Sequence, residues 1–164
     1  MQTMQKIQPF LWFEKGAEDA ASFYVDLFDD GEITGTMRYR EGWPGGVAGD
    51  VMTVSFTLAG QSFVALNGGV QPGFTFSPAI SFAVACDTQE EIDRLWGALT
   101  EGGERQPCGW LVDRFGVTWQ IVPRVLNEML ADEDRERADR VMRVMLTMSK
   151  LEIAPLRAAY DGAA

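Results

Sequence analysis

Few side chains of this chain are of the types that usually carry catalysis, because its 164 residues include no histidine and only two cysteines. Without histidine, neither a Ser-His-Asp nor a Cys-His arrangement can form. The spacing of Cys86 and Cys108 indicates no zinc site and no disulfide framework. A general acid or base would have to be an Asp, Glu, Lys, Tyr or Cys, and no paired carboxylates occur at a working spacing. The sequence therefore assigns no catalytic residue.

The candidate binding residues are neutral side chains on strand-like segments. Met52–Leu58 alternates apolar and polar residues most clearly, and its polar positions predict a sheet face that either lines a cleft or is solvated. Gln120 carries a donor and an acceptor, which predicts either contact with a ligand or an internal pair. A mostly apolar lining with a few polar groups suits a small organic ligand. The predicted substrate-binding residues are Leu11, Phe13, Thr53, Ser55, Asn67, Ser81, Trp110 and Gln120.

Hydrophobic alternation also assigns a face to each strand-like segment. The bulkier series is expected to pack under helices, which leaves Ser81 and Gln120 facing the cleft. In the first segment, Leu11 and Phe13 are expected to face the cleft and Trp12 the helix side. The bulkier series consists of Ile80, Phe82, Val84, Val117, Trp119 and Ile121.

Four residues near these segments have structural interpretations beside functional ones. Asn67 precedes a glycine pair at a strand end, where it either lines the mouth of a cleft or makes a turn. Cys108 has no histidine to activate its thiol and is expected to pack. Asp113 and Arg114 are both expected to fix a hairpin turn, and anion binding is an alternative role for Arg114.

The elements that position these residues occur twice in the same order. A strand-like run at Pro9–Phe13 precedes an amphipathic helix at Glu18–Phe28, and Ala79–Ala85 precedes a second helix at Thr88–Thr100. Later in each copy, a turn glycine opens a last strand-like run. This repetition indicates a duplicated structural unit.

The duplication predicts an α+β fold of tandem βαβββ modules that form a curled mixed sheet with a cleft, followed by a C-terminal helical tail. The expected domains are a first module at residues 1–69, a second, shortened module at 70–123 and the tail at 124–164. The last tail helix is expected at Leu151–Tyr160, interrupted by Pro155. The tail methionines fit core or dimer packing, or an adaptable binding surface.

Composition and charge exclude several classes of partner. The formal net charge is −10 and the isoelectric point is about 4.4, so nucleic acid and anionic membrane surfaces would be repelled. No apolar run is long enough to span a membrane, and the N-terminus lacks the pattern of a signal peptide. These features predict a cytoplasmic protein with reduced thiols, whose core needs no disulfide or metal.

Three phrases of the sequence carry a family resemblance: PFLWF…AEDAASFYVDLF (9–28), VMTVSFTLAGQSFVALNGG (51–69) and CGWLVDRFGVTWQIVP (108–123). They resemble the vicinal oxygen chelate superfamily, which has the glyoxalase/bleomycin resistance fold. Within it they are similar to the PhnB-like branch, whose members are often described as demethylubiquinone methyltransferase-like. The resemblance covers residues 7–123, and it implies modules whose sheets carry helices on one face and a cleft on the other.

The resemblance also implies where a metal would bind. Metal-dependent members place one ligand in the first strand and one in the last strand of each module. These positions correspond here to Pro9, Val64, Ala79 and Gln120. Only Gln120 offers a lone pair, through its carbonyl oxygen, whereas a divalent ion needs several converging ligands. We therefore expect no metal and no cofactor.

A methyl-donor site is not supported by the glycine clusters. A donor of the adenosylmethionine type usually meets a glycine-rich loop between a strand and a helix. The Gly42–Gly49 loop and the Gly68-Gly69 pair do not lead directly into a predicted helix. The residues therefore give no physical support to the methyltransferase description.

The sequence favours a non-metal glyoxalase-fold protein that binds a small organic molecule in its cleft, with catalytic activity unassigned. One alternative is a metal-dependent or transferase-type enzyme of the same superfamily. Another is an interaction module that acts through its helical tail. We expect a cytoplasmic homodimer with a small organic ligand and with neither nucleic acid nor membrane as a partner.

Overall fold

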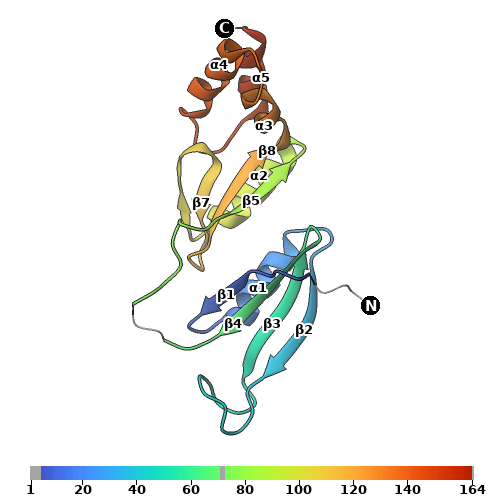
Figure 1. The fold of residues 1–164 in the computed structure, drawn as a ribbon, viewed down its shortest axis with the longest axis vertical. Coiled ribbons are helices and arrows are strands. Elements are labelled where there is room, and N and C mark those ends of the chain that lie inside the picture. The colour runs from blue at the N-terminus through green and yellow to red at the C-terminus, as the bar shows by residue number, and fades with distance from the viewer. Residues whose placement is uncertain (1–4, 71–72, 164) are drawn as a thin grey trace. The chain divides into compact units, whose positions relative to one another are not determined.

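The structure is a computed structural model that describes residues 5–70 and 73–163. The chain divides into two compact units, residues 1–74 and 75–164. Each unit contains one four-stranded mixed sheet (Figure 1). The first unit consists of β1 (Phe10–Phe13), α1 (Ala17–Asp26), β2 (Glu32–Arg38), β3 (Val51–Leu58) and β4 (Gln61–Asn67).

The sheet of the first unit has the strand order β1-β4-β3-β2, in which only β1 and β4 are parallel. The clear alternation in β3 places Val54, Phe56 and Leu58 on one face, where all three are buried. The turn between β3 and β4 is tight, and Gly60 adopts a φ of 78° that glycine takes without strain.

Helix α1 packs on the face of the sheet that carries Phe56. The Tyr24 ring stacks on Phe56, with 6.2 Å between ring centroids, and Phe56 stacks on Phe63 at 5.3 Å. Ala20 and Ala21 are fully buried, so their small side chains let the helix approach the sheet closely. This face forms the core of the first unit.

The second unit repeats the same arrangement, with the strand order β5-β8-β7-β6. Its elements are β5 (Phe82–Cys86), α2 (Gln89–Thr100), β6 (Glu104–Arg105), the 3₁₀ turn η1 (Pro107–Gly109), β7 (Trp110–Val112), β8 (Thr118–Pro123), α3 (Arg124–Leu130), α4 (Arg135–Met145) and α5 (Ile153–Asp161). Two βαβββ modules and a helical tail confirm the predicted α+β fold class.

Helix α2 begins at Gln89, one residue after the predicted start, and Thr88 is its N-cap. The Thr88 hydroxyl accepts a hydrogen bond from the Glu91 N–H at 3.2 Å, and the Glu91 carboxylate accepts one from the Asp87 N–H at 2.9 Å. These two bonds satisfy backbone donors at the N-terminus of the helix. The helix is amphipathic, as predicted, and its buried stripe consists of Ile92, Leu95, Trp96 and Leu99.

The first strand of the second unit begins later than its sequence predicts. The run Ala79–Ala85 indicated the strand, but β5 starts at Phe82. The backbone around Pro78 forms a turn in which the Ile80 N–H donates to the Ser77 carbonyl at 3.5 Å. Ile80 is consequently 74% exposed and does not pack under α2 as expected.

The tail helices gather at the end of the second unit, where β8 runs into α3 (Figure 1). They enclose a core of their own, formed by Leu126, Met129, Val141, Leu151 and Leu156. Pro155 does not interrupt the last helix, contrary to expectation, because it lies in the first turn of α5, where its missing N–H has no intrahelical acceptor.

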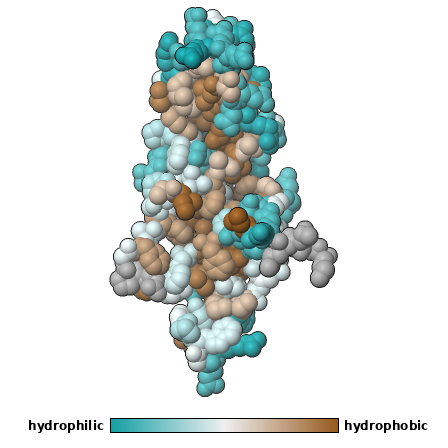
Figure 2. Space-filling view, in the orientation of Figure 1, coloured by the Kyte–Doolittle hydropathy of each residue, from teal (hydrophilic) through white to brown (hydrophobic). Residues whose placement is uncertain are grey.

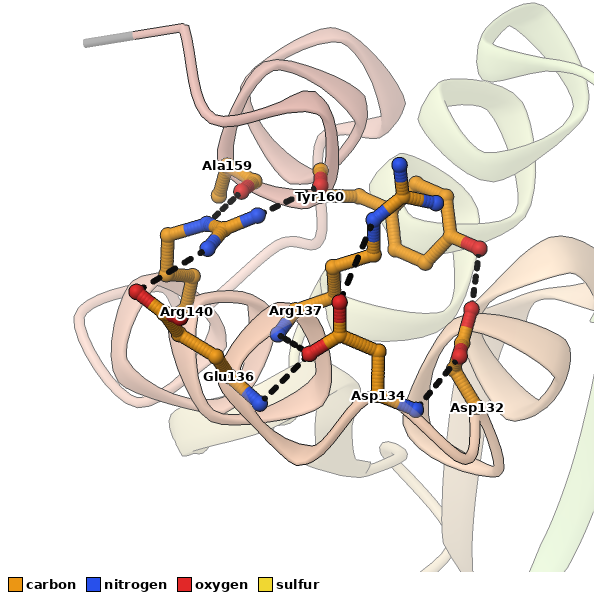
Figure 3. A network of polar contacts seen from close by, with 7 residues as sticks. All are labelled: Asp132, Asp134, Glu136, Arg137, Arg140, Ala159 and Tyr160. Atoms are coloured by element: carbon orange, nitrogen blue, oxygen red, sulfur yellow. Dashed lines mark hydrogen bonds and ion pairs between the residues drawn. The ribbon is translucent and has the colours of Figure 1, made fainter.

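Polar contacts join α5 to α4 (Figure 3). The Tyr160 hydroxyl donates to the Asp132 carboxylate, and the Arg137 guanidinium lies 4.9 Å from the centroid of the Tyr160 ring. Arg140 donates to the Ala159 carbonyl at 2.7 Å. Asp134 caps α4 by accepting from two backbone N–H groups of its first turn. None of the helices within the described ranges is long and apolar enough to cross a membrane.

Candidate functional site

One face of the second sheet carries three aligned residues from three strands. In the strand register Ala83 of β5 lies beside Gln120 of β8, which in turn lies beside Trp110 of β7. The alternating residues Leu111, Trp119 and Ile121 are buried on the face covered by α2. The row that contains Gln120 therefore lies on the face away from α2, as the alternation predicts.

Gln120 is held by a neighbouring side chain of the same face. Its Nε2 donates to the Ser81 hydroxyl at 2.9 Å. Within the described part of the chain, no group donates to its carbonyl oxygen. The structure thus brings together Ser81, Trp110 and Gln120, and it leaves one acceptor of the Gln120 amide open.

A cavity of about 290 Å³ lies over this row. Its walls are mostly apolar, and no Asp, Glu, Lys or Arg lines it among the described residues. Because amides are the main polar groups, the cavity fits a small uncharged molecule better than an ion. The lining residues are Ala83, Val84, Ala85, Cys108, Trp110, Gln120, Val122, Pro123, Leu126, Asn127, Leu130 and Met145.

A buried hydroxyl lies on the same face of β8 as Gln120. Thr118 is two residues before Gln120 and only 2% exposed, and its hydroxyl has no hydrogen-bond partner among the described residues. Buried polar groups are rarely left unsatisfied. The lack of a partner for this hydroxyl cannot be read from a sequence.

The two thiols of the chain are placed differently. Cys108 borders the cavity, and its Sγ lies 3.7 Å from the Met145 carbonyl oxygen, which agrees with the predicted packing role. Cys86 is 1% exposed. Its burial, with the nearby Glu91 and Asp87 carboxylates as lesser causes, raises the pKa of the Cys86 thiol to about 12. Cys86 is therefore protonated and unreactive at neutral pH.

Asp113 fixes the turn before β8, as expected. One carboxylate oxygen accepts from the N–H groups of Phe115 and Val117, at 2.8 and 3.0 Å. The other accepts from the indole N–H of Trp119 at 2.9 Å. Asp113 thereby ties the hairpin to the core under α2.

In the first sheet, the predicted facing of Leu11 and Phe13 is wrong. Both are buried in the core, with exposures of 6% and 5%, whereas Phe10 and Trp12 are 60% and 37% exposed. The run Phe10–Phe13 is apolar at every position, so alternation gave no polar residue from which to fix its phase. Trp12, predicted to face the helix side, lies on the opposite face.

Thr53 and Ser55 lie on the face away from α1, as predicted. They alternate in β3 with Val54 and Phe56, which are buried, and both are half-buried. In the register of the sheet, Ser55 lies beside Val64. These two polar residues therefore share a face with Phe10 and Trp12.

Asn67 has a structural role at the start of α1. Its Oδ1 accepts from the Ala17 N–H at 2.8 Å, and its Nδ2 donates to Glu18 at 2.7 Å and to the Val51 carbonyl at 3.0 Å. Gly16, at the helix N-cap, has no side chain for this purpose. Asn67 also borders a charged cavity of about 360 Å³, but both N–H donors of its amide are already engaged.

The strand register tests where a metal ligand would lie. In the first sheet, the residue of the opening strand beside Val64 is Phe10, one position after the expected Pro9. In the second sheet, the residue beside Gln120 is Ala83, four positions after the expected Ala79. Neither offers a lone pair. Over the described residues, no group of three or more His, Cys, Asp or Glu converges as metal ligands do. The donor set of these strands does not fit a divalent metal.

Two βαβββ modules, each with one helix-covered sheet face, define a protein of the glyoxalase fold. Residues 5–122 match the family described as 3-demethylubiquinone-9 3-methyltransferase. The chain belongs to this family, the PhnB-like branch of that fold.

Solved structures agree with this assignment. The chain is 42% identical to the PhnB protein of Bacillus cereus, with a TM-score of 0.66, over 73% of this chain and 99% of the other. Protein PA1353 from Pseudomonas aeruginosa is 23% identical with a TM-score of 0.57, over 72% and 96% of the two chains, and supports the fold alone. The comparison with curated proteins gives no match.

Proposed function

We propose that this protein binds a small, uncharged and partly apolar organic molecule in the cavity of its second unit, without a metal. The observation that carries the proposal is the row Ala83, Gln120 and Trp110 under an apolar cavity without charged lining. Ser81 supports it by orienting the Gln120 amide. No catalytic step is assigned, because no acid, base or nucleophile other than Cys108 borders the cavity among the described residues.

Each lining group has a definite part in this binding. The Trp110 indole offers an apolar face on which a planar ligand can stack. The free carbonyl oxygen of Gln120 accepts a hydrogen bond from a hydroxyl or N–H of the ligand, because its Nε2 is occupied by Ser81. Ala83 has a side chain small enough to leave room above the sheet.

The test is calorimetric titration of the full chain with para-ethylphenol, an uncharged aromatic probe with one hydroxyl. We expect saturable one-to-one binding. Gln120→Leu should weaken it about fivefold, since one hydrogen bond in a partly buried site contributes roughly 1 kcal/mol. Gln61→Leu, the same exchange at a β4 residue that is not part of the cavity lining, is the control and should leave binding unchanged. Failure of this and of other small uncharged aromatic probes to bind would contradict the proposal.

The family description offers methyl transfer as the alternative function. The glycine-rich loop that would be considered for a methyl donor joins the antiparallel strands β2 and β3, so it does not enter a helix. Titration with adenosylmethionine separates the two proposals. Stoichiometric binding of that donor would favour the transferase, and absence of heat would favour the binding protein.

The homodimer and the cytoplasmic location expected from the sequence stay predictions. Exposed apolar side chains on the first sheet, including Phe10 and Met37, support self-association. Analytical ultracentrifugation of the wild-type chain and of Met37→Lys checks the dimer, which we expect the charged residue to dissociate.

A further inference from the structure

The helical tail lies outside the part of the chain that matches the family. That match ends at residue 122, and α3 begins at Arg124. The PhnB protein of Bacillus cereus is covered over 99% of its length by 73% of this chain. The tail is therefore an addition to the fold that these relatives share.

The same tail supplies one wall of the cavity over Gln120. Leu126, Asn127 and Leu130 come from α3, and Met145 is the last residue of α4. The remaining lining comes from the strands and from Cys108. The sheet face alone provides a floor, and the tail adds a wall that makes the site a partly enclosed cavity.

Backbone hydrogen bonds fasten the tail next to this cavity. The N–H of Cys108 donates to the Met148 carbonyl at 2.9 Å, and the N–H of Gly109 donates to the Ser149 carbonyl at 2.7 Å. Both donors have positive φ values, 61° and 81°, which direct successive N–H groups toward the tail. A Cβ at position 109 would lie 2.7 Å from the Ile121 carbonyl oxygen, so only glycine fits there.

Helix α2 holds the tail at a second place. The Gln89 amide donates to the Leu151 carbonyl at 3.2 Å and accepts from the Ile153 N–H at 2.8 Å. Lys150 pairs with Asp93 at 2.7 Å. Leu151 is itself fully buried. With these attachments the wall is in place before a ligand arrives, which lowers the entropy lost on binding.

The outer surface of the tail is of a different character from its inner one. Figure 2 shows hydrophilic residues over the end where α4 and α5 lie, in the orientation of Figure 1. By contrast, the residues that α3 and α4 turn toward the cavity include Leu126, Leu130 and Met145. Apolar residues of the tail thus line the cavity, although Met142 and Leu146 on and just after α4 are exposed.

From this arrangement we infer that the tail sets the specificity of the cavity, an inference that rests on the proposed function. Leu130 and Met145, both half-buried, select a ligand that carries an uncharged alkyl portion. Asn127 is exposed, and its side-chain amide makes no hydrogen bond with another described residue. It supplies a polar contact for the ligand at the edge of the cavity. The ligand class is an uncharged ring with a short alkyl substituent and at least one hydroxyl or carbonyl group.

The experiment measures affinity of the full chain for a series of para-alkylphenols, from phenol to para-hexylphenol, by calorimetry. For the wild-type chain we expect the dissociation constant to fall about fourfold per added methylene while the alkyl chain still contacts the tail, and then to level off. Leu130→Ala and Met145→Ala each shorten a side chain of the wall and so enlarge the cavity. In both variants the dissociation constant should therefore level off at a longer alkyl chain.

Asn127→Leu tests the polar contact, and its matched control is Glu128→Leu on the next, exposed position of α3. We expect Asn127→Leu to weaken the binding of para-hydroxymethylphenol about fivefold, a typical loss for one exposed hydrogen bond, and to leave para-ethylphenol unchanged. Glu128→Leu should alter neither. Circular dichroism checks that each variant is folded.

The outcomes separate this inference from the proposed function. Suppose that phenols bind and that Gln120→Leu weakens their binding, but that the tail variants leave the dependence of affinity on alkyl-chain length unaltered. That result would overturn the role of the tail and leave the proposed binding site standing. If no uncharged aromatic probe binds the wild-type chain, the proposed function itself fails. A variant that does not fold is replaced by Leu130→Val or Met145→Leu, which preserve more of the packing.

Discussion

In the first unit, the N-cap residue of the helix after the opening strand is a glycine, and Asn67 from the far end of β4 supplies the capping side chain. In the second unit, the N-cap residue is Thr88, whose own side chain caps the helix. The residue that corresponds to Asn67, seven positions after the turn glycine, is Pro123. Because a local cap is present, this strand end is free to continue into α3 and the tail. The last residue of the last strand thus caps a helix in the first unit, whereas in the second unit the equivalent residue leads into the tail.

The cavities of the two units differ in the same way. The one beside Asn67 is bordered by charged residues, among them Lys15, Arg38 and Asp50. The one over Gln120 has no charged residue in its described lining. Val64 occupies the position of Gln120 in the first unit, four residues after the turn glycine. The two units therefore share a backbone arrangement but differ in the side chains that line their cavities.

The hairpin turns give the largest expected contrast between the units. Asp113→Ala leaves three donors without their acceptor, including the buried Trp119 indole, so we expect the second unit to lose roughly 4 kcal/mol of stability. Thr57→Ala, three residues before the turn glycine in the first unit, should cost less than about 0.5 kcal/mol. Hydrogen exchange measured by mass spectrometry reports on each unit separately. Equal losses from both variants would contradict the assigned role of Asp113.

The helix caps give an intermediate contrast. Asn67→Ala removes three hydrogen bonds at a partly buried site and should destabilise α1 by about 3 kcal/mol. Thr88→Ala removes one exposed cap and should destabilise α2 by about 1 kcal/mol. The measurement is the exchange protection of amides in α1 and α2. If Thr88→Ala proved the more costly, the comparison drawn between local and remote caps would be wrong.

The smallest expected effect concerns the tail and pH. The hydrogen bond from Tyr160, with the backbone N–H of Asp134 and the charge of Arg137 as lesser causes, lowers the pKa of Asp132. A lowered carboxyl pKa contributes stability that is present above the unfolded value of about 3.9 and is lost as pH falls through the folded pKa. Amide protection of α5 should therefore decrease below about pH 4.

Asp132→Asn removes the titrating group of that contact and keeps its size. The variant should show weaker α5 protection at neutral pH and a smaller decrease on acidification than the wild-type chain. Glu133→Gln, the adjacent exposed residue, is the matched control and should behave as wild type. An unchanged acid response in Asp132→Asn would show that other carboxylates govern the tail.

Most of the fold could be predicted because its signals are local. The alternation of Met52–Leu58, the helical stripe of α2 and the turn glycines each depend on residues close in sequence. The order of these elements then indicated a duplicated module. The Asp113 turn was also predicted, since its partners lie within six residues.

The site was predicted less completely because its contacts are distant in sequence. The predicted facing of Leu11 and Phe13 was wrong because their strand is apolar at every position. The capping role of Asn67 depends on its hydrogen bond with Ala17, 50 residues away, and no local pattern indicates that pairing. The wall formed by Leu130 and Met145 depends on how the tail folds back onto β8, which only tertiary structure decides.

The attachment of the tail through Cys108 and Gly109 has a consequence for how such a chain can diverge. Its acceptors are the main-chain carbonyls of Met148 and Ser149, which every amino acid possesses. Descendants of this protein can therefore exchange the exposed Ser149 side chain without losing this attachment, whereas Met148 also packs against the core of the tail. Position 109 has no such latitude, because a Cβ there would lie 2.7 Å from the Ile121 carbonyl oxygen and 2.9 Å from the Leu151 side chain.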